Sequence, residues 1–74
     1  MSNNTPIPES YRYGLYLDPK PDDPTVSELI EAADKAEALA KEQGPSTPVA
    51  VWDNRDNTVY LYLNNERFHL FNLH

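Results

Sequence analysis

The sequence predicts an α+β fold, a two-layer sandwich in which one helix packs on one face of a mainly antiparallel sheet of three or four strands. Residues 26–43 carry apolar side chains at helical spacing, and four shorter segments are rich in β-branched and aromatic residues between turn-forming residues. The predicted order of elements is therefore β-α-β-β-β. The chain has 74 residues and no cysteine, so we expect a single hydrophobic core without disulfides.

The first ten residues are predicted to form a flexible arm, because Ile7 is their one sizeable apolar side chain after Met1. The domain is predicted to span residues 11–74. It begins with a strand over residues 11–17, whose odd-numbered positions are apolar or aromatic. Gly14 lies within this strand and predicts a bulge or a site of close approach. Residues 18–24 contain three prolines and form a stiff acidic connector.

The helix is predicted over residues 26–43. Thr25 and Glu28 have the spacing of a capping box, and Gly44 followed by Pro45 ends the helix. The predicted core stripe is apolar and rich in alanine, which allows a close approach to the sheet, and it consists of Val26, Leu29, Ile30, Ala33, Ala36 and Ala40.

Three strands are predicted after the helix, over residues 49–52, 58–63 and 66–71, with Asn64 and Asn65 as a two-residue hairpin turn. Alternation assigns one set of residues to the face that meets the helix: Val49, Val51, Val59, Leu61, Leu63, Phe68 and Leu70. The uncovered face is then predicted to carry Arg12, Tyr16, Ala50, Trp52, Tyr60, Tyr62, Arg67, His69 and Phe71.

Acidic residues outnumber basic residues by twelve to six, giving a net charge of −6. This sign argues against direct nucleic-acid binding and against a membrane-surface role, both of which favour clustered lysine and arginine. Residues 18–42 contain eight of the acids and three lysines, and so hold a net charge of −5. The simplest explanation is a helix kept soluble by charge. The functional interpretation is a surface that binds a basic groove on a partner protein through Asp22, Asp23, Glu28, Glu31, Asp34 and Glu42.

The aromatic residues of the uncovered face predict a second, competing surface. An open sheet face with several aromatic side chains is a patch that monomers usually avoid, so it would serve a homodimer or an assembly partner. RNA-binding sheets also carry such aromatics, but Arg12 and Arg67 are the two cations on this face, too few for RNA. The alternative interface consists of Tyr16, Trp52, Tyr60 and Tyr62.

The sequence contains no catalytic motif that we can assign. None of the serines lies in a nucleophile elbow, and glycine occurs only at positions 14 and 44, which excludes a glycine-rich phosphate loop. Asp53, Asp56 and His69 are candidates for a metal site, but the segment around the two aspartates is more typical of a hydrogen-bonded turn. We therefore expect a non-enzymatic protein with no cofactor and no metal.

The chain from residue 11 to residue 71 resembles the anti-CRISPR proteins encoded by phages, among them inhibitors of type I surveillance complexes. The resemblance is one of architecture and charge: small size, no cysteine, an acidic helix and one α+β domain. It implies a protein that binds a Cas subunit and blocks its DNA path, with the acidic residues named above as contacts. Lys35 and Lys41 dilute the charge of the helix, which is a departure from a pure DNA mimic. The N-terminal sequence lacks the features of a signal peptide, so a cytoplasmic location is expected, that of the bacterial host for a phage protein.

Overall fold

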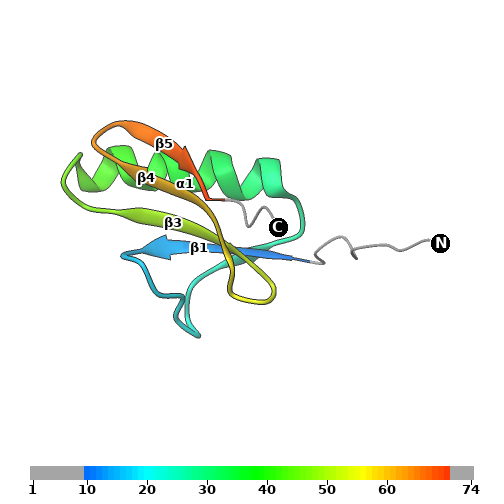
Figure 1. Cartoon of the computed structure of the whole chain (residues 1–74). Helices are drawn as coiled ribbons and strands as arrows, with labels where there is room; N and C mark the ends of the chain where they lie inside the picture. Colours follow the sequence, from blue (N-terminus) through cyan, green and yellow to red (C-terminus); the bar gives the residue numbers. More distant parts are fainter. Residues whose placement is uncertain (1–9, 71–74) are drawn as a thin grey trace.

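The structure, a computed structural model, describes residues 10–70 of the chain. These residues form one helix, α1 (Leu29–Gln43), and five strands, β1 (Tyr11–Leu15), β2 (Thr25–Val26), β3 (Val49–Asp53), β4 (Thr58–Leu63) and β5 (Glu66–His69). All neighbouring strands are antiparallel, in the order β2-β1-β3-β4-β5. Figure 1 labels α1 and the four longer strands, β1, β3, β4 and β5. The α+β class is confirmed, and the sheet has five strands rather than three or four. The predicted arm, apart from residue 10, and the predicted strand position Phe71 lie outside the described residues.

The extra strand, β2, explains why the predicted start of the helix is wrong. Thr25 lies opposite Arg12, and Val26 lies opposite Tyr11, so both residues pair with β1 instead of opening the helix. The N-cap is Glu28, in an extended conformation and without a side-chain capping bond. The other end of the helix is confirmed, because Gly44 adopts φ 100° and its N–H donates to the Ala40 carbonyl at 3.0 Å.

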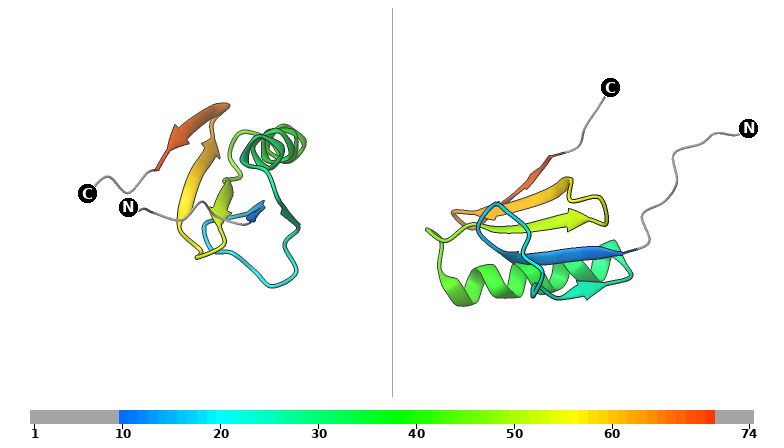
Figure 2. Two further views of the ribbon diagram at one scale, coloured as in Figure 1. Left: turned by 90° about the vertical axis from the view of Figure 1, so that its right-hand side faces the viewer. Right: turned by 90° about the horizontal axis from the view of Figure 1, so that it is seen from below.

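The core lies between α1 and the centre of the sheet. Its buried members are Ala32, Ala36, Val49, Val51 and Tyr62. The alanines allow α1 to approach the sheet closely, since a methyl group is the whole side chain at the contact. The helix contacts β1, β2, β3 and β4 but not β5 (Figure 2). One end of the sheet is therefore left without a covering layer.

The structure reverses the predicted faces of β4 and β5. Val49 lies opposite Tyr62, and Val51 lies opposite Tyr60, so these two tyrosines share the face of the core valines. Arg67 and His69 lie opposite them on β5 and occupy the same face. The face opposite α1, called the outer face below, carries residues that were predicted to meet the helix: Leu61, Leu63, Phe68 and Leu70. The register shifts beside Val51 and Trp52, where the irregular pairing lets Val59 pack against the core as predicted.

The connector between β1 and β2 lies on the outer face. Gly14 belongs to that face, and a Cβ atom at this position would come within 2.5 Å of the Asp23 carboxylate. The prediction of a close approach at Gly14 is thereby confirmed. The Asp23 carboxylate also accepts a hydrogen bond from the Lys20 N–H at 2.9 Å, which holds the connector in a turn. On the same face, Trp52 lies opposite Arg12 and is 1% exposed.

The Tyr62 hydroxyl ties the sheet to the helix and predicts a loss of stability in alkali. It donates to the Ala33 carbonyl at 3.1 Å, and burial raises its pKa above the ordinary 10.0. The folded state therefore holds this proton more tightly than the unfolded state, so stability is lost as the pH rises through 10.0. We expect Tyr62→Phe to cost about 1 kcal/mol near neutral pH and to flatten the alkaline decline.

Urea unfolding of the wild type and Tyr62→Phe near neutral pH and in alkali measures both effects. Tyr16→Phe is the control, because Tyr16 is 56% exposed. This substitution should change neither the free energy of unfolding near neutral pH nor its decline in alkali. An alkaline decline of equal slope in the wild type and in Tyr62→Phe would contradict the assignment to Tyr62.

Candidate functional site

Three of the predicted contact acids lie together at the N-cap and in the first half of α1. Glu28, Glu31 and Asp34 follow one another at a spacing of three residues and are exposed. Between them Ile30 is 77% exposed, although it was predicted to belong to the core stripe. These four residues, with Lys35, line a shallow hollow. We call Glu28, Ile30, Glu31 and Asp34 the acidic helix surface.

The remaining predicted acids lie elsewhere. Asp22 and Asp23 are on the connector, which lies on the other side of the sheet from α1 (Figure 2). The Asp23 carboxylate is occupied by the Lys20 N–H and lies against Gly14. Glu42 lies in the last turn of the helix, about 21 Å along the axis from Glu28. The structure thus divides the predicted acidic surface and leaves the acidic helix surface as its one compact part.

The predicted aromatic surface is not formed on the outer face. Trp52 is 1% exposed and Tyr62 is 5% exposed, so neither presents its ring to a partner. Tyr60 is half-buried on the helix side, where its ring meets those of Tyr62 and His69 edge-on, with centroids 6.4 Å and 4.9 Å away. Tyr16 is exposed in the connector, with the Lys20 ammonium 5.6 Å from its ring centroid.

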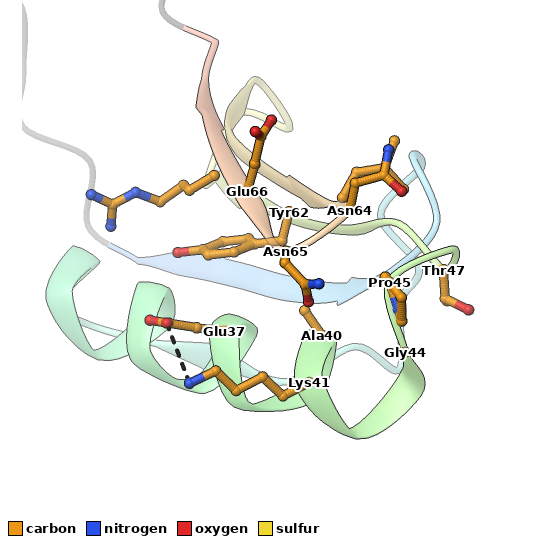
Figure 3. Close-up of a pocket in the computed structure, with 12 residues that line it drawn as sticks. Glu37, Ala40, Lys41, Gly44, Pro45, Thr47, Tyr62, Asn64, Asn65 and Glu66 are labelled. Carbon is orange, nitrogen blue, oxygen red and sulfur yellow. Dashed lines mark ion pairs between the residues drawn. The ribbon is translucent and has the colours of Figure 1, made fainter.

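A groove that sequence reasoning missed lies between the second half of α1 and the β4–β5 hairpin (Figure 3). It has a volume of about 370 Å³. Figure 3 shows the Tyr62 ring above the ion pair of Glu37 and Lys41, whose charged atoms are 3.6 Å apart. The hairpin turn is fixed to the loop that follows α1, because the Asn64 N–H donates to the Pro45 carbonyl at 2.9 Å. The sequence could have indicated this groove only if Tyr62 had been assigned to the face of the sheet that meets the helix.

Arg67 is held over the tyrosines beside this groove. Its guanidinium carbon is 4.8 Å from the centroid of the Tyr60 ring, a cation–π contact. A hydrogen bond with the Tyr62 hydroxyl raises the pKa of Arg67 further above its ordinary value. Arg67 and Lys41 bring positive charge to the groove, but Glu37 and Glu66 balance it. The groove is consequently not strongly selective for ligands of either charge.

The candidate metal residues form a turn, as the alternative interpretation predicts. The Asp53 carboxylate accepts hydrogen bonds from the N–H groups of Arg55 and Asn57, each at 2.9 Å. His69 lies on β5 with its ring against Tyr60. Within residues 10–70 there is no group of three or more histidines, cysteines or acids that could hold a metal ion.

The same part of the chain contains no helix with the length and apolar character needed to cross a membrane. Comparison of the chain with protein-family models, with curated proteins and with solved structures found no match in any of the three.

Proposed function

We propose that this protein is a non-enzymatic inhibitor that uses the acidic helix surface to bind a basic, nucleic-acid-handling protein. The observation that carries the proposal is Ile30, which is 77% exposed among three acids on a well-packed helix. An exposed apolar side chain flanked by charged side chains has the composition of an interface, in which an apolar centre is surrounded by a polar rim.

The helix presents these side chains in a fixed arrangement. Its opposite side is anchored by Ala32 and Ala36, both fully buried against the sheet. A rigid element loses little conformational freedom on binding, which favours affinity. Carboxylates on the first turn also lie near the positive end of the helix dipole, so the same charges stabilise the helix in the free protein.

Glu28 supports an intermolecular role for the charge. It occupies the N-cap position, where serine, threonine, aspartate or asparagine would normally accept a backbone hydrogen bond. The Glu28 side chain makes no such bond and is exposed. Its carboxylate is therefore available to a cation on a partner.

The resemblance to anti-CRISPR proteins directs the choice of partner. A Cas subunit of a type I surveillance complex presents a basic path for DNA, and opposite charge would speed the encounter and make it sensitive to salt. We place the complex in the bacterial cytoplasm, with occlusion of target DNA as its effect.

Charge reversal on the acidic helix surface tests the proposal. The triple variant Glu28→Lys, Glu31→Lys, Asp34→Lys should bind a purified type I surveillance complex at least about 100-fold more weakly than the wild type. Ile30→Ala should weaken binding about tenfold or more without changing the salt dependence. Surface plasmon resonance at low and high salt measures both.

The matched control reverses three acids outside this surface. Asp18→Lys, Asp22→Lys, Glu42→Lys changes the net charge equally but leaves the first half of the helix intact. We expect it to retain most of the affinity and to lose part of the association rate. Equal losses in both triple variants, or an affinity of the wild type that is independent of salt, would contradict binding through this surface.

A further inference from the structure

The groove between the second half of α1 and the β4–β5 hairpin shares no lining residue with the acidic helix surface. It forms because α1 contacts β4 but not β5, so the helix side of the hairpin is left partly uncovered. Its volume of about 370 Å³ lies in the lower part of the range of ligand pockets, which is about 300–1,000 Å³. A space of this size holds a small molecule rather than a folded partner.

Both walls of the groove are held in place before any ligand binds. The bond from the Asn64 N–H to the Pro45 carbonyl joins the hairpin turn to the loop after α1. Within that loop the Thr47 N–H donates to the Gly44 carbonyl at 3.3 Å. Asn64 and Asn65 adopt left-handed φ values that fix the turn. A preformed site loses little conformational freedom on binding, which favours affinity for a small molecule.

Two opposite charges in the groove keep hydrogen-bonding capacity for a ligand. The ion pair with Lys41 uses the Oε2 atom of Glu37, at 3.6 Å, which leaves its Oε1 atom to accept from a ligand. Arg67 is exposed, and the Tyr62 hydroxyl engages only part of the five N–H donors of its guanidinium. The contact with the Tyr60 ring, at 4.8 Å, fixes the position of the guanidinium and leaves its other donors open to solvent.

Glu37 and Arg67 act on each other across the groove without forming an ion pair. The pKa of Arg67 is raised first by the Tyr62 hydroxyl and further by the negative charge of Glu37, so the two charged groups are near each other. Among residues 10–70, the cation that pairs with Glu37 is nevertheless Lys41. A carboxylate on α1 and a guanidinium on β5 thus stand on opposite walls of the groove.

The balance of charge selects the class of ligand. A dicarboxylate would be repelled by Glu37 and Glu66, and a diamine by Arg67 and Lys41. An uncharged apolar molecule would displace water from these four groups without replacing its hydrogen bonds, which is unfavourable. A small zwitterion is neutral overall and gives each wall the opposite charge.

We propose that the groove binds a free α-amino acid with an uncharged side chain, its carboxylate on Arg67 and its ammonium on Glu37. A guanidinium binds a carboxylate through two parallel hydrogen bonds, and hydrogen bonds between charged groups are about twice as strong as neutral ones. The ligand side chain then runs along Ala40 toward Pro45 and Thr47, which lie toward the other end of the groove from Glu37 (Figure 3).

Heteronuclear NMR titration with leucine and with glutamine tests binding. At least one of the two should bind with a Kd of about 1 mM or lower, and the shifted amides should lie in the second half of α1 and the β4–β5 hairpin. The amide of that amino acid lacks the carboxylate and its N-acetyl derivative lacks the ammonium, so each should bind at least about tenfold more weakly. No shifts with either amino acid at about 10 mM, shifts confined to other parts of the chain, or equal binding of the blocked and free forms would overturn the proposal.

Two substitutions identify the groups that hold the ligand. Glu37→Gln and Arg67→Gln should each weaken binding at least about tenfold, because each removes a charge with which the ligand pairs. Glu42→Gln and Arg55→Gln are matched controls, since they remove the same charges from exposed positions outside the groove.

The blocked ligands separate direct binding from an indirect effect on the fold. In Glu37→Gln the N-acetyl derivative should bind as well as the free amino acid, and in Arg67→Gln the amide should do so, because the lost ligand charge then has no partner to lose. Equal weakening by the controls, or blocked ligands that remain the weaker ones in both groove variants, would overturn the assignment of the two charges.

Discussion

Replacing Trp52 with alanine is expected to destabilise the fold more than any other single truncation considered for this chain. The side chain is 1% exposed on β3, and its removal leaves a cavity that cannot close without moving β1 or β4. Losses of this kind amount to about 3–5 kcal/mol. A domain of this size has a total stability near the lower end of about 5–15 kcal/mol, so Trp52→Ala should be largely unfolded at 37 °C.

Thermal unfolding followed by far-ultraviolet circular dichroism measures the effect, because the variant lacks the one tryptophan. We expect the Tm to fall by more than about 10 °C. Tyr16→Ala is the control, since it removes an aromatic ring that is 56% exposed, and its Tm should stay within about 2 °C of the wild type. If the Tm of Trp52→Ala equals that of the wild type, the outer face is not packed as the structure shows.

Enlarging Ala36 to leucine is expected to have the second-largest effect. Ala36 is fully buried where α1 meets the sheet, so three additional carbon atoms would force the helix away from the core. Overpacking of this kind costs about 1–3 kcal/mol, and the complete burial of Ala36 places the expected cost at the upper end of this range.

Ala38→Leu is a matched control on the same helix. Alanine and leucine have similar helix propensities, and Ala38 is exposed, so this substitution should change the free energy of unfolding by less than about 0.5 kcal/mol. Urea titration of both variants separates packing from propensity. Equal destabilisation by the two substitutions would contradict the position of the helix on the sheet.

Several elements could be predicted from local sequence because local chemistry determines them. The strict alternation of Tyr11, Tyr13 and Leu15 placed β1 with the correct side to the core. Asn64 and Asn65 tolerate the left-handed region, and they adopt φ values of 57° and 64° in the hairpin turn. Gly44 ended the helix for the same conformational reason.

The face of β4 could not be predicted in the same way. Its segment is apolar or aromatic at nearly every position, so alternation gave two acceptable choices. The assignment of Leu61 and Leu63 to the core face was wrong, because pairing with β3 places Tyr60 and Tyr62 on that face. A register set by a distant strand overrides a local preference. The prediction of where the helix starts was wrong for the same reason, because Thr25 and Val26 pair with β1.

For the candidate site, exposure of the helix acids followed from helical periodicity alone. The division of the acids did not, because the path of the connector across the outer face depends on the contact of Asp23 with Gly14. Ile30 was misplaced since it lies at the margin of the apolar stripe, and the alanines already fill the space beneath the helix.

The position of Trp52 has a practical consequence for spectroscopy. It is the one tryptophan of the chain, and it is enclosed on the side of the sheet opposite α1. Its emission should therefore report whether the sheet is intact and remain silent when a protein docks on the helix. A titration in which that emission shifts would signal that the ligand rearranges the fold, whereas binding without a spectral change would indicate rigid docking.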